Sequence, residues 1–401
     1  MSGALAGVRV LDLSRVLAGP WAAQTLGDLG AEVIKIERPG TGDETRGWGP
    51  PFAAGGDAAY FLCANRNKKS VAVDLAQPEG AELVRALAAQ SDVVLENFRA
   101  GALAAYGLDY PAVAAANPAV VYCSITGFGQ TGPYRERPGY DLLVQAMGGL
   151  MSVTGRPDGE PGAGPQKTGV AVTDILTGLY ASTAILAALL HRRATGTGQY
   201  IDLALLDVQV ASLANLSMNY LVSGVVPQRM GNAHPSIVPY QDFPTADGAL
   251  VIAAGNDAQF ARLCGELGLS ELAQDPRFAR NQDRVAHRQA LILQLCAATR
   301  ERPTAHWVDR LEAAGVPCGP INGIDAVFDD PQVRAREMQI SMPHAAAGRV
   351  PLVASPLRLS ASPASYRLTP PALGAHTREV LADLLKMSDA QIDDLAARGI
   401  V

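Results

Sequence analysis

Short apolar runs alternate with longer amphipathic segments over the first 130 residues of the chain. Five of these runs have the length and β-branched content of buried strands, at residues 8–13, 32–37, 70–75, 93–95 and 120–125. Helices are predicted between them at 21–29 and 78–90. Strands separated by helices predict βαβ units and a parallel sheet, which binds ligands at the carboxyl ends of its strands. The fold class predicted for this part is therefore α/β.

The next part of the chain has a different pattern of hydrophobic and polar residues. An apolar, alanine-rich helix is predicted at 175–193, followed by a strand at 200–205. From about residue 225 to 324, a loop rich in Pro, Asn and His at 231–239 precedes a short strand at 249–253 and several helices. This pattern predicts a separate and smaller α+β unit.

Composition and charge narrow the classes of protein. Of the 401 residues, 48% are hydrophobic and 18% are charged, which is typical of a chain that builds a core. The net charge is −6 and no long basic run occurs, so nucleic acid is not an expected partner. A mildly acidic protein still binds an anionic ligand where a few Arg and Lys side chains converge.

The cysteine pattern bears on compartment and metals. Five cysteines are scattered along the chain without a C-x-x-C pair, which indicates free thiols in a reducing cytoplasm. We expect no bound metal, because His and Cys never cluster at ligand spacing. The sequence shows no signal peptide pattern and no uncharged apolar run of about 18 residues, so no membrane span is expected.

The loop after the first strand tests one function of such a sheet, dinucleotide binding. Glu37 ends the second strand, where an acid that binds a ribose would stand. The loop itself reads Ser-Arg-Val-Leu-Ala-Gly-Pro over residues 14–20 and lacks G-x-G-x-x-G, so its backbone is not built to approach a pyrophosphate in that way. This argues against a nicotinamide cofactor.

Asp174 is a lone carboxylate among apolar residues, just before the long helix. One interpretation is a helix start, in which Thr173 or Asp174 caps the first amides. The other is a nucleophile, because a carboxylate can attack an activated carbonyl and form a covalent intermediate. Gly169 and Gly178 on either side would let a substrate approach the backbone closely. The two interpretations are compatible.

Basic and amide side chains follow the ends of successive predicted strands. These residues are Arg38, Asn97, Arg99 and Arg137. Each taken alone fits a solvated surface, but together they suit an anionic cofactor with phosphates and an adenine ring. Arg can stack on the ring or bind a phosphate with two nitrogens.

Several motifs, in this order and spacing, make the sequence resemble the class III CoA-transferases, which include formyl-CoA and carnitine CoA-transferases. The motifs are VLAGP at 16–20, LGDLGAEVIKIE at 26–37, ENFR at 96–99, GFG at 127–129, the Asp174 segment, TGTGQ at 195–199 and LGAHT at 373–377. The resemblance covers nearly the whole chain. It implies an enzyme that uses acyl-CoA as a substrate and holds no permanent cofactor.

The family implies a Rossmann-like large domain built from both chain ends, plus a small domain, in two interlocked ring-shaped subunits. The implied segments are a large CoA-binding domain at 1–200, a linker at 201–224, a small α+β domain at 225–325, and a linker with the return to the large domain at 326–401. A cytoplasmic homodimer without nucleic-acid or membrane partners is therefore expected.

The resemblance also carries the expected site onto this chain. The catalytic aspartate falls on Asp174, which implies aspartyl anhydride and aspartyl-CoA thioester intermediates. The CoA contacts fall on Val16, Ala18, Arg38, Asn97 and Phe98.

Two departures from the family pattern affect these contacts. A basic residue common about seven positions after Phe98 is replaced here by Ala104-Ala105, and Arg99 is the candidate substitute. Leu17 stands where formyl-CoA transferases carry glutamine, and their glycine-rich loop is absent. Both features argue against oxalate and formyl-CoA as substrates.

Two other functions fit the same fold. The α-methylacyl-CoA racemases need a histidine in a G-H-D triplet, which reads Gly139-Tyr140-Asp141 here. Because a tyrosine titrates near pH 10, Tyr140 would be a poor proton shuttle at neutral pH. The remaining alternative is a CoA-binding protein without catalysis, in which Asp174 is only a cap.

A closer resemblance concerns the acceptor. The segments NAHPSIVPYQ at 232–241 and GVPCGPIN at 315–322 are similar to the succinyl-CoA:dicarboxylate branch, which includes glutarate and itaconate CoA-transferases. A C4 to C6 dicarboxylate keeps one ionised carboxylate in the site, and burying it requires a cationic or donor-rich partner. The predicted substrate contacts are Arg46, Tyr140 and His234.

Overall fold

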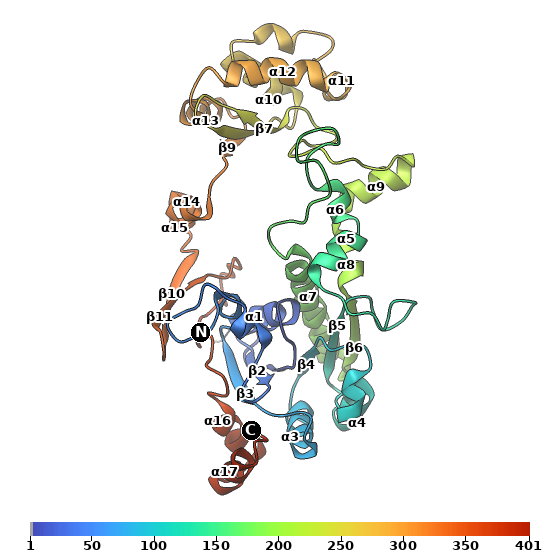
Figure 1. Cartoon of the computed structure of the whole chain (residues 1–401), viewed down its shortest axis with the longest axis vertical. Helices are drawn as coiled ribbons and strands as arrows, with labels where there is room; N and C mark the ends of the chain where they lie inside the picture. Colours follow the sequence, from blue (N-terminus) through green and yellow to red (C-terminus); the bar gives the residue numbers. More distant parts are fainter. Residues whose placement is uncertain (1–2) are drawn as a thin grey trace. The chain divides into compact units, whose positions relative to one another are not determined.

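The computed structural model describes residues 3–401, which form two compact units (Figure 1). Among the described residues, the first unit combines 3–150, 167–225 and 332–401. The second combines 151–166 and 226–331. The segment 151–166, which lies within the large domain in the sequence-based division, is therefore part of the second unit.

A parallel six-stranded sheet forms the centre of the first unit, in the order β3-β2-β1-β4-β5-β6. Its strands are β1 (Arg9–Asp12), β2 (Glu32–Glu37), β3 (Lys68–Ala72), β4 (Val93–Glu96), β5 (Val121–Thr126) and β6 (Gln199–Ala204). All neighbouring strands pair in parallel. The mixed α/β fold with a parallel sheet confirms that part of the prediction. The strand order reverses between β1 and β4, where doubly wound sheets bind ligands.

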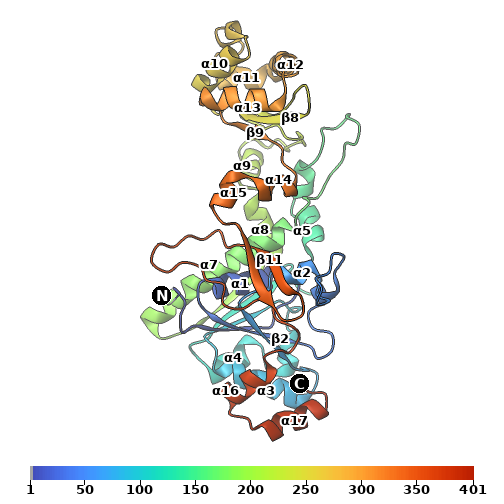
Figure 2. The ribbon, with the colours of Figure 1, turned by 90° about the vertical axis from the view of Figure 1, so that its left-hand side faces the viewer.

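Alternate residues of the central strands face opposite layers, as a sheet buried on both sides requires. Val10 and Leu95 pack with α1 (Ala18–Asp28) and α7 (Val172–Thr195). Leu11 and Val94 pack on the other face with helices α3 (Pro78–Ala89), α4 (Tyr110–Ala116) and α16 (Thr377–Leu385). Figure 2 shows α3, α4 and α16 grouped together.

Shorter elements complete the first unit. They are η1 (Glu44–Gly47), α2 (Ala59–Leu62), η2 (Ala102–Tyr106), α5 (Asp141–Met147), α8 (Leu205–Ser212), α9 (Ala214–Ser223), α17 (Asp389–Ala397) and the hairpin of β10 (Gln339–His344) and β11 (Gly348–Val353). Helices α6 (Leu150–Val153) and α15 (Pro331–Ala335) lie at the boundaries between the units.

The C-terminal part returns to the first unit at the sheet edge. The imidazole Nδ1 of His376 accepts a hydrogen bond from the Ser70 amide at 3.2 Å. The Thr377 hydroxyl accepts one from the Ala72 amide at 2.9 Å. These contacts satisfy amides that the edge strand β3 would otherwise present to solvent.

The second unit is a small α+β structure with its own core. An antiparallel sheet of β7 (Tyr240–Pro244), β8 (Ala249–Ala253) and β9 (Cys318–Pro320) packs against helices. Its helices are α10 (Asp257–Glu266), η3 (Ser270–Ala273), α11 (Asn281–Ala286), α12 (Arg288–Thr299), α13 (Thr304–Ala313) and α14 (Ile324–Asp329).

Helix α7 is long and apolar enough to cross a membrane by those two criteria alone. In the structure it packs against α1, β5 and β6. Its Ala181, Ile185 and Ala188 are buried in the core beside the sheet. This arrangement is typical of the core helix of an α/β domain.

Candidate active site

Asp174 is the third residue of α7. Helix α7 approaches α1 closely at Gly178, one turn further along. A Cβ atom on Gly178 would lie only 2.8 Å from the carbonyl oxygen of Ala18. Glycine at this position therefore lets the helix that carries Asp174 lie directly against the start of α1.

The first turn of α7 is capped by Asp141, from a different segment of the chain. Its Oδ1 accepts hydrogen bonds from the amides of Thr173 at 2.9 Å and Asp174 at 3.3 Å. Gln145 holds the other oxygen of Asp141 at 2.6 Å. The Thr173 hydroxyl donates instead to Gln209 at 2.6 Å. The interpretation of Thr173 or Asp174 as the cap is therefore wrong.

The Asp174 carboxylate is 9% exposed. It has no hydrogen-bond donor among the residues that the structure describes. Burial, with the charge of Asp141 as a second cause, raises the pKa of Asp174 to about 7. A largely buried carboxylate that accepts no hydrogen bond is a strong base and nucleophile for its kind.

Tyr60 is a neighbour of Asp174 that no sequence pattern indicated. Burial raises the pKa of Tyr60 to about 12, and the charge of Asp174 is the next largest cause. The phenol ring packs edge-on against Trp48, with 5.3 Å between the ring centroids. The sequence holds no signal for this contact, because Tyr60 is more than 100 residues before Asp174 and stands in no motif.

A cavity of about 430 Å³ lies at the carboxyl ends of β1 to β4. Its lining comes from the segments that follow these strands, including Leu13, Arg15, residues 36–38, 41–44 and 73–76, Phe98 and Tyr106. The position is the one expected for a ligand of a doubly wound sheet. Arg15 pairs with Glu44 at 2.5 Å, which leaves Arg38 and the rings of Phe98 and Tyr106 to suit an anionic ligand with a planar ring system.

The structure brings some predicted cofactor residues to this cavity and leaves others elsewhere. Arg38 and Phe98 line it. The Arg38 guanidinium has no partner in the described part of the chain. Arg99 and Arg137 are exposed, do not line the cavity, and Arg137 lies over the ring of Tyr134 at 4.1 Å.

Asn97, Val16 and Ala18 belong to the loop beside the cavity. The Asn97 amide group pairs with the backbone of Arg15, accepting from its N–H at 2.8 Å and donating to its carbonyl at 2.7 Å. Asn97 thus shapes this loop. Val16 lies in the loop, and Ala18 begins α1.

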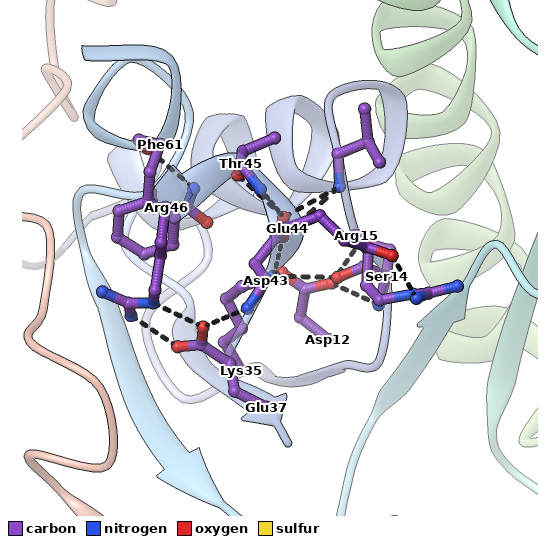
Figure 3. Close-up of polar contacts among 12 residues, drawn as sticks. Asp12, Ser14, Arg15, Lys35, Glu37, Asp43, Glu44, Thr45, Arg46 and Phe61 are labelled. Carbon is purple, nitrogen blue, oxygen red and sulfur yellow. Dashed lines mark hydrogen bonds and ion pairs between the residues drawn. The ribbon is translucent and has the colours of Figure 1, made fainter. Parts of the chain in front are cut away.

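Arg46 does not present a free cation to a substrate. Its Nε and Nη2 donate to the two carboxylate oxygens of Glu37 at 2.8 and 2.7 Å, and its Nη1 pairs with Asp57 at 3.0 Å. The guanidinium also lies 3.7 Å from the ring centroid of Phe61 (Figure 3). The role of Arg46 as a substrate contact therefore gains no support, because protein acceptors occupy all three of its nitrogens.

Tyr140 and His234 lie in different units. Tyr140 is 64% exposed in the first unit and directly precedes Asp141, the residue that caps α7. His234 belongs to the second unit, where its ring packs against Tyr240 at 5.4 Å between centroids.

The loop at 234–238 is held from one side by α11 and α12. Asn281 and Arg284 bond its backbone at Ser236 and Val238. Arg288 donates to the carbonyls of His234 and Pro235 at 2.8 and 2.9 Å.

These contacts define the state of the His234 ring. Its Nδ1 accepts the Ser236 amide at 3.0 Å, so a neutral ring carries its proton on Nε2. No acidic side chain pairs with Arg288 in the described part of the chain, and burial lowers its pKa. The loop thus combines an Nε2–H donor with a cation that lacks a counter-charge.

No group of three or more His, Cys, Asp or Glu within residues 3–401 is placed to hold a metal ion. The five cysteines are all free thiols.

The sheet order and the cavity at its strand ends define an α/β protein of the Rossmann-like class. Residues 5–377 match the family described as CoA-transferase family III, and the chain belongs to this family. It is thus an enzyme, a class III CoA-transferase, for which CoA thioesters are substrates.

Known relatives cover nearly the whole chain. A succinate–glutarate CoA-transferase from Agrobacterium fabrum is 51% identical over 95% of each chain. The human succinyl-CoA:glutarate CoA-transferase is 46% identical over 99% of this chain and 90% of its own. The crystal structure of a CAIB/BAIF family protein from Brucella suis has a TM-score of 0.85 at 49% identity, over 96% of this chain and all of the other. The resemblance to the succinyl-CoA:dicarboxylate branch is confirmed.

Proposed function

We propose that this enzyme moves CoA from succinyl-CoA to a C4 to C6 dicarboxylate, with Asp174 as the covalent nucleophile. The observation that carries the mechanism is the buried carboxylate of Asp174, which has no hydrogen-bond donor and a raised pKa. The donor and the acceptor class are supported by the names of relatives at 46–51% identity.

The first half-reaction releases the donor acid. A carboxylate oxygen of Asp174 attacks the thioester carbonyl, the C–S bond breaks, and an aspartyl–succinyl anhydride and CoA thiolate form. The thiolate then attacks the aspartyl carbonyl of the anhydride. Succinate leaves with the bridging oxygen, and an aspartyl-CoA thioester remains.

The second half-reaction repeats these steps in the opposite order. The acceptor carboxylate attacks the aspartyl thioester and displaces CoA thiolate, which then attacks the acceptor carbonyl. The new thioester leaves and Asp174 returns as a carboxylate, with no net proton consumed. Covalent transfer keeps the free energy of the thioester, which hydrolysis would lose, so the steps require exclusion of water.

The racemase alternative is weaker at the level of residues. It needs a second acid/base near neutral pH, and Tyr140 stands at that position. An α-methylacyl-CoA incubated in deuterated water is the discriminating substrate. Enzyme-dependent exchange at its α-carbon would restore the isomerase proposal.

We propose that the second unit recognises the acceptor: His234 and Arg288, which both belong to it, bind a carboxylate of a dicarboxylic acid. The loop contains a donor, His234 Nε2–H, and a cation without an acidic partner, Arg288. A neutral N–H donor and a cation are the partners that a carboxylate removed from water requires. Arg46, by contrast, is already neutralised by Glu37 and Asp57.

Replacing Arg288 by glutamine should raise KM for glutarate about tenfold, because a charge-assisted contact to the remote carboxylate is lost. KM for butyrate as acceptor should change little. Arg280→Gln is the matched control, since Arg280 is an exposed cation of the same unit. Equal losses for glutarate and butyrate in Arg288→Gln would place the acceptor elsewhere and leave the transferase chemistry intact.

Large apolar side chains are exposed on helices of the first unit. They include Leu190 on α7 at 70% and Leu221 and Val222 on α9 at 71% and 80%. Large apolar side chains left exposed on helices mark candidate interfaces between proteins. We propose that a second copy covers these helices in the interlocked homodimer that the family resemblance implies.

Sedimentation velocity at nanomolar concentration should therefore show a dimer without monomer. Interlocked rings separate only after partial unfolding, so dilution alone is not expected to dissociate them. A reversible shift to monomer on dilution would contradict the interlocked arrangement, although an ordinary dimer would still be compatible with the apolar surfaces.

A further inference from the structure

Side chains from other segments hold residues 14–16 of the loop between β1 and α1. Ser14 is fixed by Asp12, which accepts its amide at 3.0 Å and its hydroxyl, and by Lys35, whose Nζ donates to its carbonyl at 2.8 Å. Asn97 holds both backbone groups of Arg15. These three side chains come from β1, from β2 and from the segment after β4.

Val16 continues the loop in an unusual conformation. Its φ is +70°, in the left-handed region that a β-branched residue rarely occupies. Its amide points to the carboxylate of Asp43, with nitrogen–oxygen distances of 3.4 and 3.3 Å. A conformation of this kind persists only where the surroundings enforce it, and strained residues of this kind cluster at functional sites.

Asp43 is a buried group with several simultaneous partners. Lys35 lies 3.0 Å from one of its oxygens, and Thr45 donates to the other from its amide at 3.0 Å and its hydroxyl at 2.7 Å (Figure 3). Burial would raise the pKa of Asp43, but Lys35 and the hydrogen bonds from Thr45 lower it to about 2. The carboxylate is therefore charged at neutral pH, and it faces the Val16 amide.

The loop touches a functional feature at each end. The Arg15 guanidinium lines the cavity and lies 5.3 Å from the ring centroid of Phe98. At the other end, the carbonyl of Ala18 abuts α7 at Gly178, one turn after Asp174. Any shift of the loop thus moves the cavity wall and the start of α1 together.

We propose that Asp43, supported by Lys35, is a positioning residue for CoA transfer: it holds Val16 in the left-handed conformation and so fixes the loop between the cavity and the helix of Asp174. This inference rests on the proposed role of Asp174 and on CoA lying along the loop. Asp43 does not touch the reacting atoms. It acts through the backbone of Val16.

Replacing Asp43 by asparagine removes the charge and gives one oxygen where two were used. Whichever position that oxygen takes, the NH2 group in the other position faces the Val16 amide and a second donor, either Lys35 or Thr45. We expect the rate of transfer from succinyl-CoA to fall about 10- to 100-fold, the cost typical of misplacing a reacting group by about 1 Å. KM for the acceptor acid should stay unchanged.

The decisive experiment is a double-mutant cycle with Val16→Gly. Glycine adopts φ near +70° without strain, so the loop no longer needs Asp43 to hold it there. The ratio of rates between Asp43→Asn and its parent should therefore be near one in the Val16→Gly background. A merely structural role for Asp43 predicts the same loss in both backgrounds, and that result would overturn the proposal.

Two further variants keep the test interpretable. Asp57→Asn is the control. Asp57 is a carboxylate of the same region that pairs with Arg46 and has no contact with the loop. The melting temperature of this variant should fall, while its transfer rate stays at the wild-type level. If Asp43→Asn does not fold, Thr45→Val serves instead, because it removes only one of the hydrogen bonds that hold Asp43. Val16→Gly must then rescue the smaller rate loss of Thr45→Val.

A loss of rate in Asp57→Asn as large as in Asp43→Asn would refute a specific role for Asp43. The transferase proposal has an independent readout, because Asp174→Ala abolishes the covalent intermediate in every background.

Discussion

Asp174→Ala and Asp174→Asn should lose CoA transfer by at least about 1,000-fold while still folding. The physical reason is that no other group replaces the attacking carboxylate, and uncatalysed exchange between a thioester and a free acid is slow. Wild-type enzyme incubated with succinyl-CoA alone should gain the mass of a CoA thioester on the peptide that contains Asp174. Hydroxylamine should remove that mass, because it cleaves thioesters.

The variants also make a prediction about stability that separates folding from chemistry. Wild-type Asp174 must ionise in a buried site, and the rise of its pKa from 3.8 to about 7 corresponds to at most about 4 kcal/mol of lost stability at pH 8. Because the folded-state pKa is the higher one, this cost is absent below about pH 4, grows as the pH rises from about 4 to about 7, and is constant above that. Asp174→Asn should therefore melt at a higher temperature than wild type at pH 8 and at a similar temperature at pH 4.

An active Asp174→Ala enzyme would show that another group is the nucleophile. An inactive variant with a lowered melting temperature at pH 8 would indicate damage to the fold instead. Only the combination of lost transfer, lost adduct and raised stability at pH 8 fits the proposed role of a strained, buried carboxylate.

Most of the central sheet follows from local pattern. The strand predicted at 32–37 is β2, and the strand predicted at 249–253 is β8, with the same bounds. The helix predicted at 175–193 extends to Val172–Thr195. These elements were accessible because a buried parallel strand is a continuous apolar run and a core helix is a long one.

The hairpin of β10 and β11 was not predicted, because its region is rich in proline. Pro343 and Pro351 lie within its two strands and interrupt the pattern. A two-stranded hairpin tolerates them because each strand has a free edge. Its inner residues Met342 and Val350 pack on Phe61, more than 270 residues away in the sequence, and no local signal reveals that contact.

The partners of charged residues were the least predictable part of the site. The sequence placed Arg46 near the substrate, whereas Glu37 and Asp57 hold it in the structure. The cap of α7 comes from Asp141, which is 32 residues before Thr173. The sequence shows which residues are charged. Which of them form ion pairs depends on how the loops at the strand ends pack against one another.

The rate of the first half-reaction should rise with pH and level off above about pH 7, so that its pH profile has an acidic limb with a midpoint near 7. Attack requires ionised Asp174, and its pKa is raised to about 7 by burial first and by the charge of Asp141 second. The rate of adduct formation from succinyl-CoA should therefore fall about tenfold per pH unit below the pKa, and reach about one hundredth of its plateau at pH 5. Measuring the adduct rather than turnover removes the ionisation of the acceptor acid from the profile.

Asp141→Asn tests the electrostatic part of this prediction. The asparagine oxygen can still accept the amides of Thr173 and Asp174, so the cap of α7 is kept while the charge is removed. The limb should move to lower pH but remain above the ordinary value of 3.8, because burial is the larger cause. Asp141→Ala is the matched control, since it removes the cap as well and should also lower the plateau rate. A limb that stays at pH 7 in Asp141→Asn would show that Asp141 acts on α7 only as a cap, while a limb absent from wild type would mean that Asp174 is not the titrating nucleophile.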